Sequence, residues 1–223
     1  MSVVLRHALV RNNVITRPEA VIGQWTTTQL AQSTTVRATA GAVYRCFWGD
    51  GTIDSYVGNG ADQVCAHNYG AAGTYIQKWV IADATKLLFV NYNSNLLVGL
   101  IPTFLNKSAL IQWYCSVNSL TGLIPSLSNN QALIRLRCDS NKLTGYTASA
   151  LATTIITFRV DTNLLPQSAI DQILADFATN VAARPAVVTL NLGGVGNAAP
   201  SAAGLASKAA ILAAKPGWII TNN

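Results

Sequence analysis

The sequence LLFVNYNSNLLVGLIP, residues 87–102, aligns position by position with LIQWYCSVNSLTGLIP, residues 110–125. Both follow the pattern Leu-x-x-Leu-x-Leu-x-x-Asn-x-Leu with conservative replacements, and the pattern occurs five times between Leu87 and Asn197. The pattern residues of the five copies are Leu87, Val90, Tyr92, Asn95 and Leu97; Leu110, Trp113, Cys115, Asn118 and Leu120; Leu133, Leu136, Cys138, Asn141 and Leu143; Ile155, Phe158, Val160, Asn163 and Leu165; and, in a degenerate last copy, Val187, Leu190, Leu192, Val195 and Asn197. Such a repeat predicts a solenoid, and it favours binding or scaffolding over catalysis.

Each copy is expected to begin with a short parallel strand that directs the pattern residues inward. One copy cannot bury its apolar face alone, and stacking of successive copies supplies the missing surface. The asparagine at the ninth position can hydrogen-bond backbone groups of the turn that would otherwise be buried without partners. Cys115 and Cys138 take the same inward position in consecutive copies, and we interpret them as small core residues.

The same register defines the side chains that point outward. Their three rows are Phe89, Gln112, Arg135, Thr157 and Thr189; Asn91, Tyr114, Arg137, Arg159 and Asn191; and Asn93, Ser116, Asp139, Asp161 and Gly193. Aromatic residues and arginine are enriched at binding hot spots. The candidate binding residues are therefore Phe89, Gln112, Tyr114, Arg135, Arg137 and Arg159. A second, compatible interpretation is a solvated ladder in which Arg137 and Arg159 pair with Asp139 and Asp161.

The segment that follows the asparagine also repeats. Gly-Leu-Ile-Pro occupies residues 99–102 and 122–125, and Leu-Thr-Gly occupies residues 143–145. The first four pattern asparagines are spaced by 23, 23 and 22 residues. With this spacing, about 135 residues resemble the plant-type leucine-rich repeat, which also occurs in bacterial and phage proteins. The resemblance implies that the glycine-containing segment forms the convex side of each coil.

The end of the chain departs from the simple pattern. Residues 168–182 place apolar side chains at helical spacing after a serine cap, with Asp171 in the first turn. Residues 201–214 repeat this arrangement before Pro216 and Gly217, and residues 218–221 are expected to form a final strand. Because terminal repeats need a modified edge, this segment is expected to close the solenoid.

Residues 24–82 are expected to form antiparallel β-structure. The segments 26–28, 34–37 and 42–48 are rich in β-branched and aromatic residues and are separated by glycine-rich turns, as in a small β-sandwich. Three motifs resemble the PKD domain, an Ig-like family of spacer and contact modules: YRCFWGDGT at 44–52, HNY at 67–69 and GTYI at 73–76. Cys46 and Phe47 depart from that family's Trp and Asp.

Cys46 and Cys65 leave two alternatives open. A disulfide between two strands would close a loop of ~20 residues and stabilise the fold by about 3 kcal/mol. A protein assembled in the cytosol would instead keep both cysteines as buried thiols. The four cysteines and two histidines show no metal-ligand spacing, so neither a metal site nor a cofactor is predicted. Asp50 and His67 are interpreted as turn and packing residues.

The composition excludes several classes of function. Charged residues make up 11% of the 223 residues, and the net charge of +6 reflects few acidic residues rather than a basic run, so no nucleic-acid partner is expected. No apolar stretch reaches the ~18–20 residues of a membrane span, and the N-terminus shows no signal peptide. Without a nucleophile-elbow, zinc-protease or phosphate-loop motif, the chain is predicted not to be an enzyme.

Together these observations predict a multi-domain fold: an all-β Ig/PKD-like sandwich followed by a leucine-rich-repeat solenoid, with parallel strands and with helical turns near the C-terminus. The expected boundaries are an N-terminal arm at residues 1–22, the sandwich at 23–84, and the repeat domain with its cap at 85–223.

The expected function rests on analogy with these families. It is that of a non-enzymatic structural protein at the surface of a bacteriophage virion, as a capsid decoration, head fibre or tail-associated protein. Its partners would be capsid or tail proteins of the same virion, a host-surface glycan or protein, and further copies of the chain, with residues 1–22 as the anchor. The alternative is a bacterial cell-surface or secreted adhesin.

Overall fold

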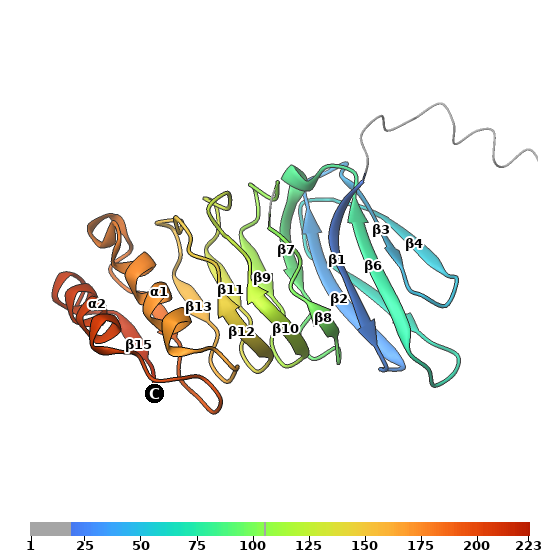
Figure 1. Cartoon of the computed structure of the whole chain (residues 1–223). Helices are drawn as coiled ribbons and strands as arrows, with labels where there is room; N and C mark the ends of the chain where they lie inside the picture. The colour runs from blue at the N-terminus through green and yellow to red at the C-terminus, as the bar shows by residue number, and fades with distance from the viewer. Residues whose placement is uncertain (1–18, 105) are drawn as a thin grey trace, which may run out of the picture.

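In a computed structural model of the chain, the structure describes residues 19–104 and 106–223. It is mostly β-sheet, with few helices, and two layers of strands run along an elongated molecule (Figure 1). Within the described residues, one sheet has seven strands in the order β12-β10-β8-β1-β6-β3-β4. The other has eight strands in the order β15-β14-β13-β11-β9-β7-β2-β5. Both sheets cross from the antiparallel N-terminal half into the parallel repeat half.

The N-terminal half is a sandwich with an aromatic core. Its strands are β1 (Ala20–Thr27), β2 (Ala31–Ala38), β3 (Val43–Phe47), β4 (Ile53–Val57), β5 (Gln63–Asn68) and β6 (Tyr75–Ile81). Trp25, Trp48 and Trp79 are buried between the sheets. The predicted segments overlap β1, β2 and β3, but β1 starts earlier than expected. Ala20 and Val21 of the predicted arm pair with β6, and Ile22, at a bulge between Val21 and Gly23, is buried. Residues 1–18 of that arm lie outside the described residues.

The repeat half places one short strand of each coil in the eight-stranded sheet. These strands are β7 (Leu87–Asn91), β9 (Gln112–Tyr114), β11 (Arg135–Arg137), β13 (Thr157–Arg159), β14 (Thr189–Asn191) and β15 (Ile219–Thr221). They pair in parallel and in the predicted register, with Arg135 opposite Gln112 on one side and Thr157 on the other. The inward pattern residues of the first four copies are buried or nearly so.

The glycine-containing segments form strands on the opposite side of the coils. β8 (Val98–Leu100), β10 (Ser119–Ile124) and β12 (Lys142–Tyr146) pair in parallel, so about three turns make a β-solenoid-like region. Gly122 has φ +79°, and a Cβ atom there would lie 2.7 Å from Leu100 Cδ2. Glycine at this position therefore allows the leucine of the preceding coil to lie across the strand.

An asparagine ladder connects the coils. The Asn141 side-chain amide donates to Cys115 O at 2.9 Å, and Leu120 N donates to Asn141 Oδ1 at 2.9 Å. Asn118 and Asn163 make the same kinds of bond one coil away on either side. The side chains thus satisfy buried backbone groups of two consecutive coils, as the repeat predicted.

In the last copy, the predicted register holds for the strand, where Leu190 and Leu192 are buried, but is wrong at the first and ninth positions. Val187 and Val195 are 61% and 88% exposed, whereas Val188 is buried. The ladder position belongs to Asn197, whose Oδ1 accepts from Leu165 N at 3.0 Å. The glycine-rich turn before Asn197 lengthens this coil, and its glycines at 194 and 196 have φ +90° and +98°. The pattern therefore shifts where the turn becomes longer.

The sandwich occupies the place of a preceding coil. Asn95 donates to Ser33 O of β2 at 3.1 Å, so the first ladder residue bonds to the sandwich. Trp25 of β1 donates to Leu100 O at 3.1 Å, and its ring lies 4.4 Å from that of Tyr92. The predicted boundary at residues 84 and 85 falls in the short 3₁₀ helix η1 (Ala84–Lys86), and both sheets continue past it.

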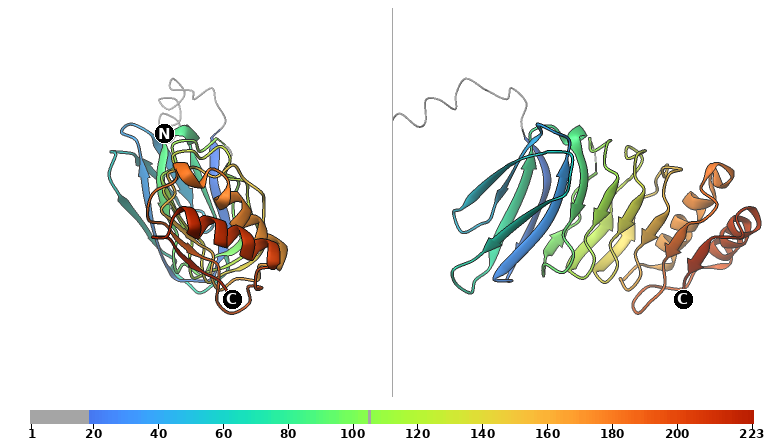
Figure 2. Two further views of the ribbon diagram at one scale, coloured as in Figure 1. Left: turned by 90° about the vertical axis from the view of Figure 1, so that its left-hand side faces the viewer. Right: turned by 180° about the vertical axis from the view of Figure 1, so that it is seen from behind.

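Helices close the other end (Figure 2). α1 (Gln167–Ala178) and α2 (Ala202–Ala214) pack together, with the 3₁₀ helix η2 (Val181–Ala183) between them in sequence. The side chain of Ser201 caps α2 as expected, but α1 begins after Pro166 without a side-chain cap. Asp171 lies beyond the first turn of α1 and accepts from Ser201 N at 2.9 Å, which joins the helices. The described helices are all too short or too polar to span a bilayer.

Candidate functional site

The candidate site is the outward side of the eight-stranded sheet. In β9, β11, β13 and β14 the middle residue is buried and the two flanking residues are partly exposed. The structure therefore places five of the six predicted residues on this face with part of their surface accessible. They are Gln112, Tyr114, Arg135, Arg137 and Arg159.

Phe89, the sixth predicted residue, is on this face but is only 6% exposed. The guanidinium of Arg37, from β2, lies 5.6 Å from the centre of its ring, and the ring of Tyr114 meets it edge-on at 5.3 Å. Arg37 also forms an ion pair with Asp62, Nε to Oδ1 2.7 Å, and that hydrogen bond raises the pKa of Arg37. The repeat could not indicate Arg37, because β2 lies outside it.

Stacking and ion pairs hold the central side chains in place. The Arg137 guanidinium lies 5.5 Å from the ring centre of Tyr114. Arg159 donates to both carboxylate oxygens of Asp161, at 3.2 and 3.1 Å, and this hydrogen bonding raises the pKa of Arg159. Asp139 lies 3.8 Å from Arg159 and accepts from Ser116 Oγ at 2.7 Å. The structure thus contains the expected arginine–aspartate ladder alongside the exposed aromatic ring.

Arg135 differs from the other arginines of the face. Within residues 19–104 and 106–223 it makes no ion pair and no side-chain hydrogen bond, and it is partly exposed between Gln112 and Thr157. Each aspartate of the face has its own arginine: Asp62 pairs with Arg37, Asp139 with Arg137 at 3.9 Å, and Asp161 with Arg159. The unmatched positive charge at the centre of the face is therefore that of Arg135, which suits it to accept an anionic group.

A second polar cluster lies at the tip of the sandwich. His67 Nε2 lies 2.7 Å from Asp50 Oδ2, and the His67 ring stacks on Trp48 at 4.7 Å. Thr52 donates both its hydroxyl and its backbone N–H to Asp50, and these bonds lower the pKa of Asp50 to about 2. This geometry fits the turn and packing roles expected for Asp50 and His67. Among the described residues, no group of three or more His, Cys, Asp or Glu side chains could hold a metal ion.

Cys46 and Cys65 are free thiols, fully buried in the sandwich. Burial raises the pKa of Cys65 to about 11. The structure shows the reduced form of this pair, and a disulfide between Cys46 and Cys65 stays a prediction.

No protein-family model matches the chain, and a search of curated proteins gives no match. The inference of function therefore depends on the geometry of the exposed face.

Proposed function

We propose that this protein is a non-enzymatic binding protein that presents the face around Tyr114, Arg135 and Arg137 to a protein or a glycan. The observation that carries the proposal is the ordered arrangement of these side chains: Arg137 stacks on Tyr114 and leaves Arg135 unpaired beside them. Side chains that are already immobilised lose little conformational entropy when a ligand binds. Tyrosine and arginine are also the residue types that dominate binding energy at interfaces.

We further propose that the fold is a PKD-like sandwich joined to a leucine-rich repeat. The asparagine ladder supports the second assignment, as do the repeated glycines, since Gly122 lies against Leu100 and Gly145 against Leu123 of the preceding coil. For the first, the motif at residues 44–52 runs from β3 into a glycine turn, and the motif at 73–76 opens β6. Such an architecture suits a surface protein of a bacteriophage virion, and the alternative is a bacterial surface adhesin.

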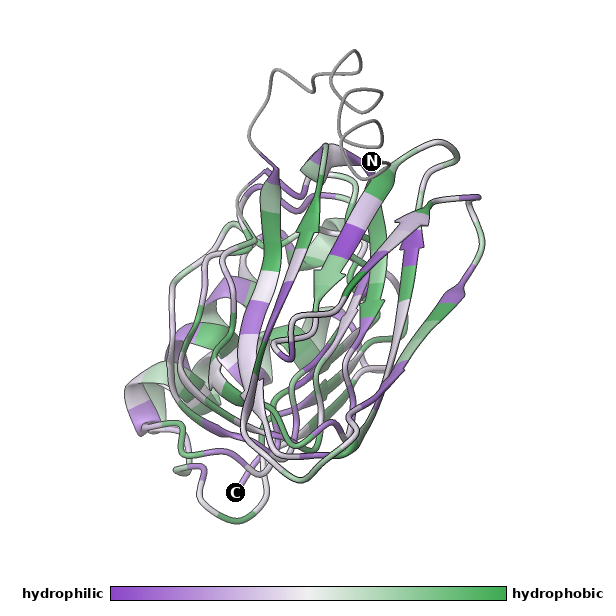
Figure 3. Ribbon diagram, turned by 90° about the vertical axis from the view of Figure 1, so that its right-hand side faces the viewer, coloured by the Kyte–Doolittle hydropathy of each residue, from purple (hydrophilic) through white to green (hydrophobic). Residues whose placement is uncertain are grey.

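The sandwich end suits assembly, because it carries two outermost strands. β4 and β5 each pair with a single strand among the described residues, and Figure 3 looks onto this end. In an antiparallel pair every second residue directs its backbone groups away from its partner. The residues that do so are Ile53, Ser55 and Val57 on β4 and Val64, Ala66 and Asn68 on β5.

None of these six outward-facing residues is charged, although soluble proteins usually protect such edges with lysine or proline. Val57 O does accept from Gln63 Nε2 at 3.1 Å, which leaves fewer free groups at that end of β4. We propose that capsid or tail proteins, or sister copies, add a strand at this end, while the binding face stays accessible.

The virion proposal is tested by mass spectrometry of purified phage particles from the host that carries this gene. We expect the protein at a fixed ratio to the major capsid protein, and its absence from particles would contradict the proposal. The double variant Ser55→Lys/Ala66→Lys should reduce particle attachment, whereas Lys208→Ala, at the opposite end on α2, should not.

The binding face is tested separately with an array of glycans and with pull-down of host envelope proteins. We expect Arg135→Gln and Tyr114→Ala to reduce binding by about tenfold or more, the loss of a typical hot-spot contact. Asn129→Ala, an exposed substitution outside the face, is the matched control. Equal binding by all variants would exclude this face as the contact surface.

A further inference from the structure

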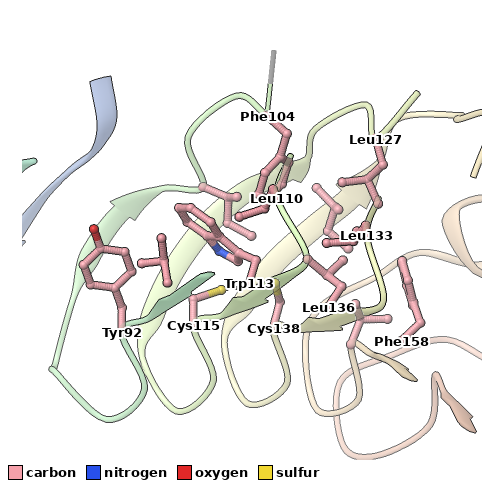
Figure 4. Packing of buried hydrophobic residues seen from close by; sticks show 14 of the residues in the cluster. Tyr92, Phe104, Leu110, Trp113, Cys115, Leu127, Leu133, Leu136, Cys138 and Phe158 are labelled. Carbon is pink, nitrogen blue, oxygen red and sulfur yellow. Dashed lines mark hydrogen bonds between the residues drawn. The ribbon is translucent and has the colours of Figure 1, made fainter. Parts of the chain in front are cut away.

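Cys115 and Cys138 face each other in the core of consecutive coils. They follow directly after β9 and β11, where Tyr114 lies opposite Arg137, so the cysteines are neighbours across this parallel pair. Both side chains are fully buried, and their Sγ atoms lie 3.1 Å apart (Figure 4). Trp113 and Leu136 pack in the same core region.

This arrangement is close to that of a disulfide. Neighbouring strands are ~4.8 Å apart, which lies within the Cα separation of about 4.4–6.8 Å found across disulfides. The two Sγ atoms must approach by about 1 Å to reach covalent distance, and a small side-chain rotation can supply this movement. We propose that Cys115 and Cys138 form a disulfide that links two consecutive coils when the chain folds in the presence of a disulfide oxidant.

The chemistry is a thiol–disulfide exchange with a low-molecular-weight disulfide such as oxidised glutathione. The thiolate of one cysteine attacks the glutathione disulfide, releases one glutathione thiolate and forms a mixed disulfide. The second cysteine then attacks the protein sulfur of this intermediate and releases the other glutathione. Two protein thiols are oxidised, one glutathione disulfide is reduced to two thiols, and the two protein protons end on glutathione.

Burial determines when this exchange takes place. Neither sulfur is exposed in the folded chain, and burial raises the pKa of the Cys138 thiol well above its ordinary value. Exchange requires an accessible thiolate, so the bond forms while the coils are still stacking. Once formed, it is shielded from reductants by the same packing.

The test is a refolding experiment on the full chain. Protein unfolded in guanidinium with a reductant is refolded either in oxidised or in reduced glutathione and then analysed by intact mass and peptide mapping. We expect the first sample to lose two hydrogen atoms, to yield a linked peptide pair containing Cys115 and Cys138, and to unfold at a higher denaturant concentration. Four alkylatable cysteines in that sample, or a linkage through Cys46 or Cys65, would overturn the proposal.

Timing and specificity have their own controls. Addition of oxidised glutathione to the already folded, reduced protein should give no bond, and a reductant added to the folded, oxidised protein should not break it. Cys115→Ala should abolish the linkage, whereas Cys46→Ala should leave it intact. Because the two wild-type samples differ only in redox buffer, the result stands even where a variant fails to fold. It is also independent of what the exposed face binds.

Discussion

The two halves of the molecule bury backbone by different means. In the sandwich, strands of five to eight residues pair with one another and satisfy most of their own polar groups. In the repeat half, most strands of the eight-stranded sheet have three residues, and side-chain amides such as that of Asn141 bond the carbonyls between them. The stability of the sandwich thus depends on strand pairing and aromatic packing. The stability of the coils depends on the asparagine at the ninth position of the repeat.

A substitution in one half should therefore act differently from one in the other. The loss of a hairpin contact in the sandwich should destabilise mainly the two strands that make it. A ladder asparagine bonds two coils, so its loss affects both neighbours. The halves meet where Trp25 contacts Tyr92 and where β2 pairs with β7, so we expect the loss of Trp25 to affect both of them.

The largest effect is expected at this junction. Trp25→Ala removes a buried indole and its hydrogen bond to Leu100 O, and should cost about 3–5 kcal/mol of unfolding free energy. Hydrogen exchange should then rise in β7 and β9 as well as in β1. Trp48→Ala, equally buried but within the sandwich, should cost a similar amount without raising exchange in β9. The same exchange pattern in both variants would show that this junction does not couple the halves.

The next largest effect is expected within the ladder. Asn141→Ala leaves the buried Leu120 N–H without a partner and removes one of the bonds accepted by Cys115 O and Cys138 O, which keep their bonds from Asn118 and Asn163. The variant should be destabilised by about 3 kcal/mol. Asn129→Ala, at an exposed position, should change stability by less than about 0.5 kcal/mol. Denaturant unfolding followed by circular dichroism measures both. Equal, small losses would show that water replaces the amide and that the ladder contributes little.

The sequence predicts the repeat half well because the period of the sequence is also the period of the contacts between coils. Each inward position of the first four copies meets its equivalent in the next coil, so one register places the core and the exposed face together. The prediction fails where a repeat residue contacts a residue from outside the repeat. Arg37 of β2, for example, covers Phe89. It also fails at Val195, where a longer turn shifts the register.

The sequence also gives no signal for two buried cations. Arg184 donates to Phe177 O and Ala152 O, and Lys107 donates to Thr103 O, so both satisfy loop carbonyls where the coils become irregular. Neither position belongs to the repeat pattern. Their contacts depend on loop paths that periodicity does not specify. The pairing of β5 with β2 likewise joins segments that are distant in the sequence.

Lys107 provides the third prediction, since it departs from the apolar packing of the coils. It is 2% exposed, and burial lowers the pKa of its amine to about 8 from 10.5. Between these two values the unfolded chain binds more protons, so stability should rise with pH across that window. Relative to Lys107→Met, the wild-type protein should gain on the order of 2 kcal/mol between pH 7 and pH 10.5. A constant difference across this range would mean that the amine stays hydrated.

The smallest effect is expected at the sandwich tip, where Asp50 organises a single turn and not a ladder. Its carboxylate accepts two hydrogen bonds from Thr52 and lies 2.7 Å from His67 Nε2. These interactions hold the pKa of Asp50 at about 2, below its ordinary 3.8. The stabilisation is therefore complete above pH 3.8 and is lost as the pH falls through 2. Asp50→Asn should be less stable than wild type at pH 7, and the two should converge towards pH 2.

The matched control for this prediction is Asp62→Asn, which removes an exposed carboxylate paired with Arg37. A surface ion pair of this kind should contribute less than about 1 kcal/mol at pH 7. Hydrogen exchange at pH 7 adds the spatial test. In Asp50→Asn, protection from exchange should fall only around residues 48–52 and β5, because the contacts of Asp50 are with Thr52 in the same turn and with His67 in β5. Loss of protection as far as β9 would mean that a substitution in the sandwich destabilises distant strands, as a substitution in the ladder is expected to do. The contrast between the two halves would then be wrong.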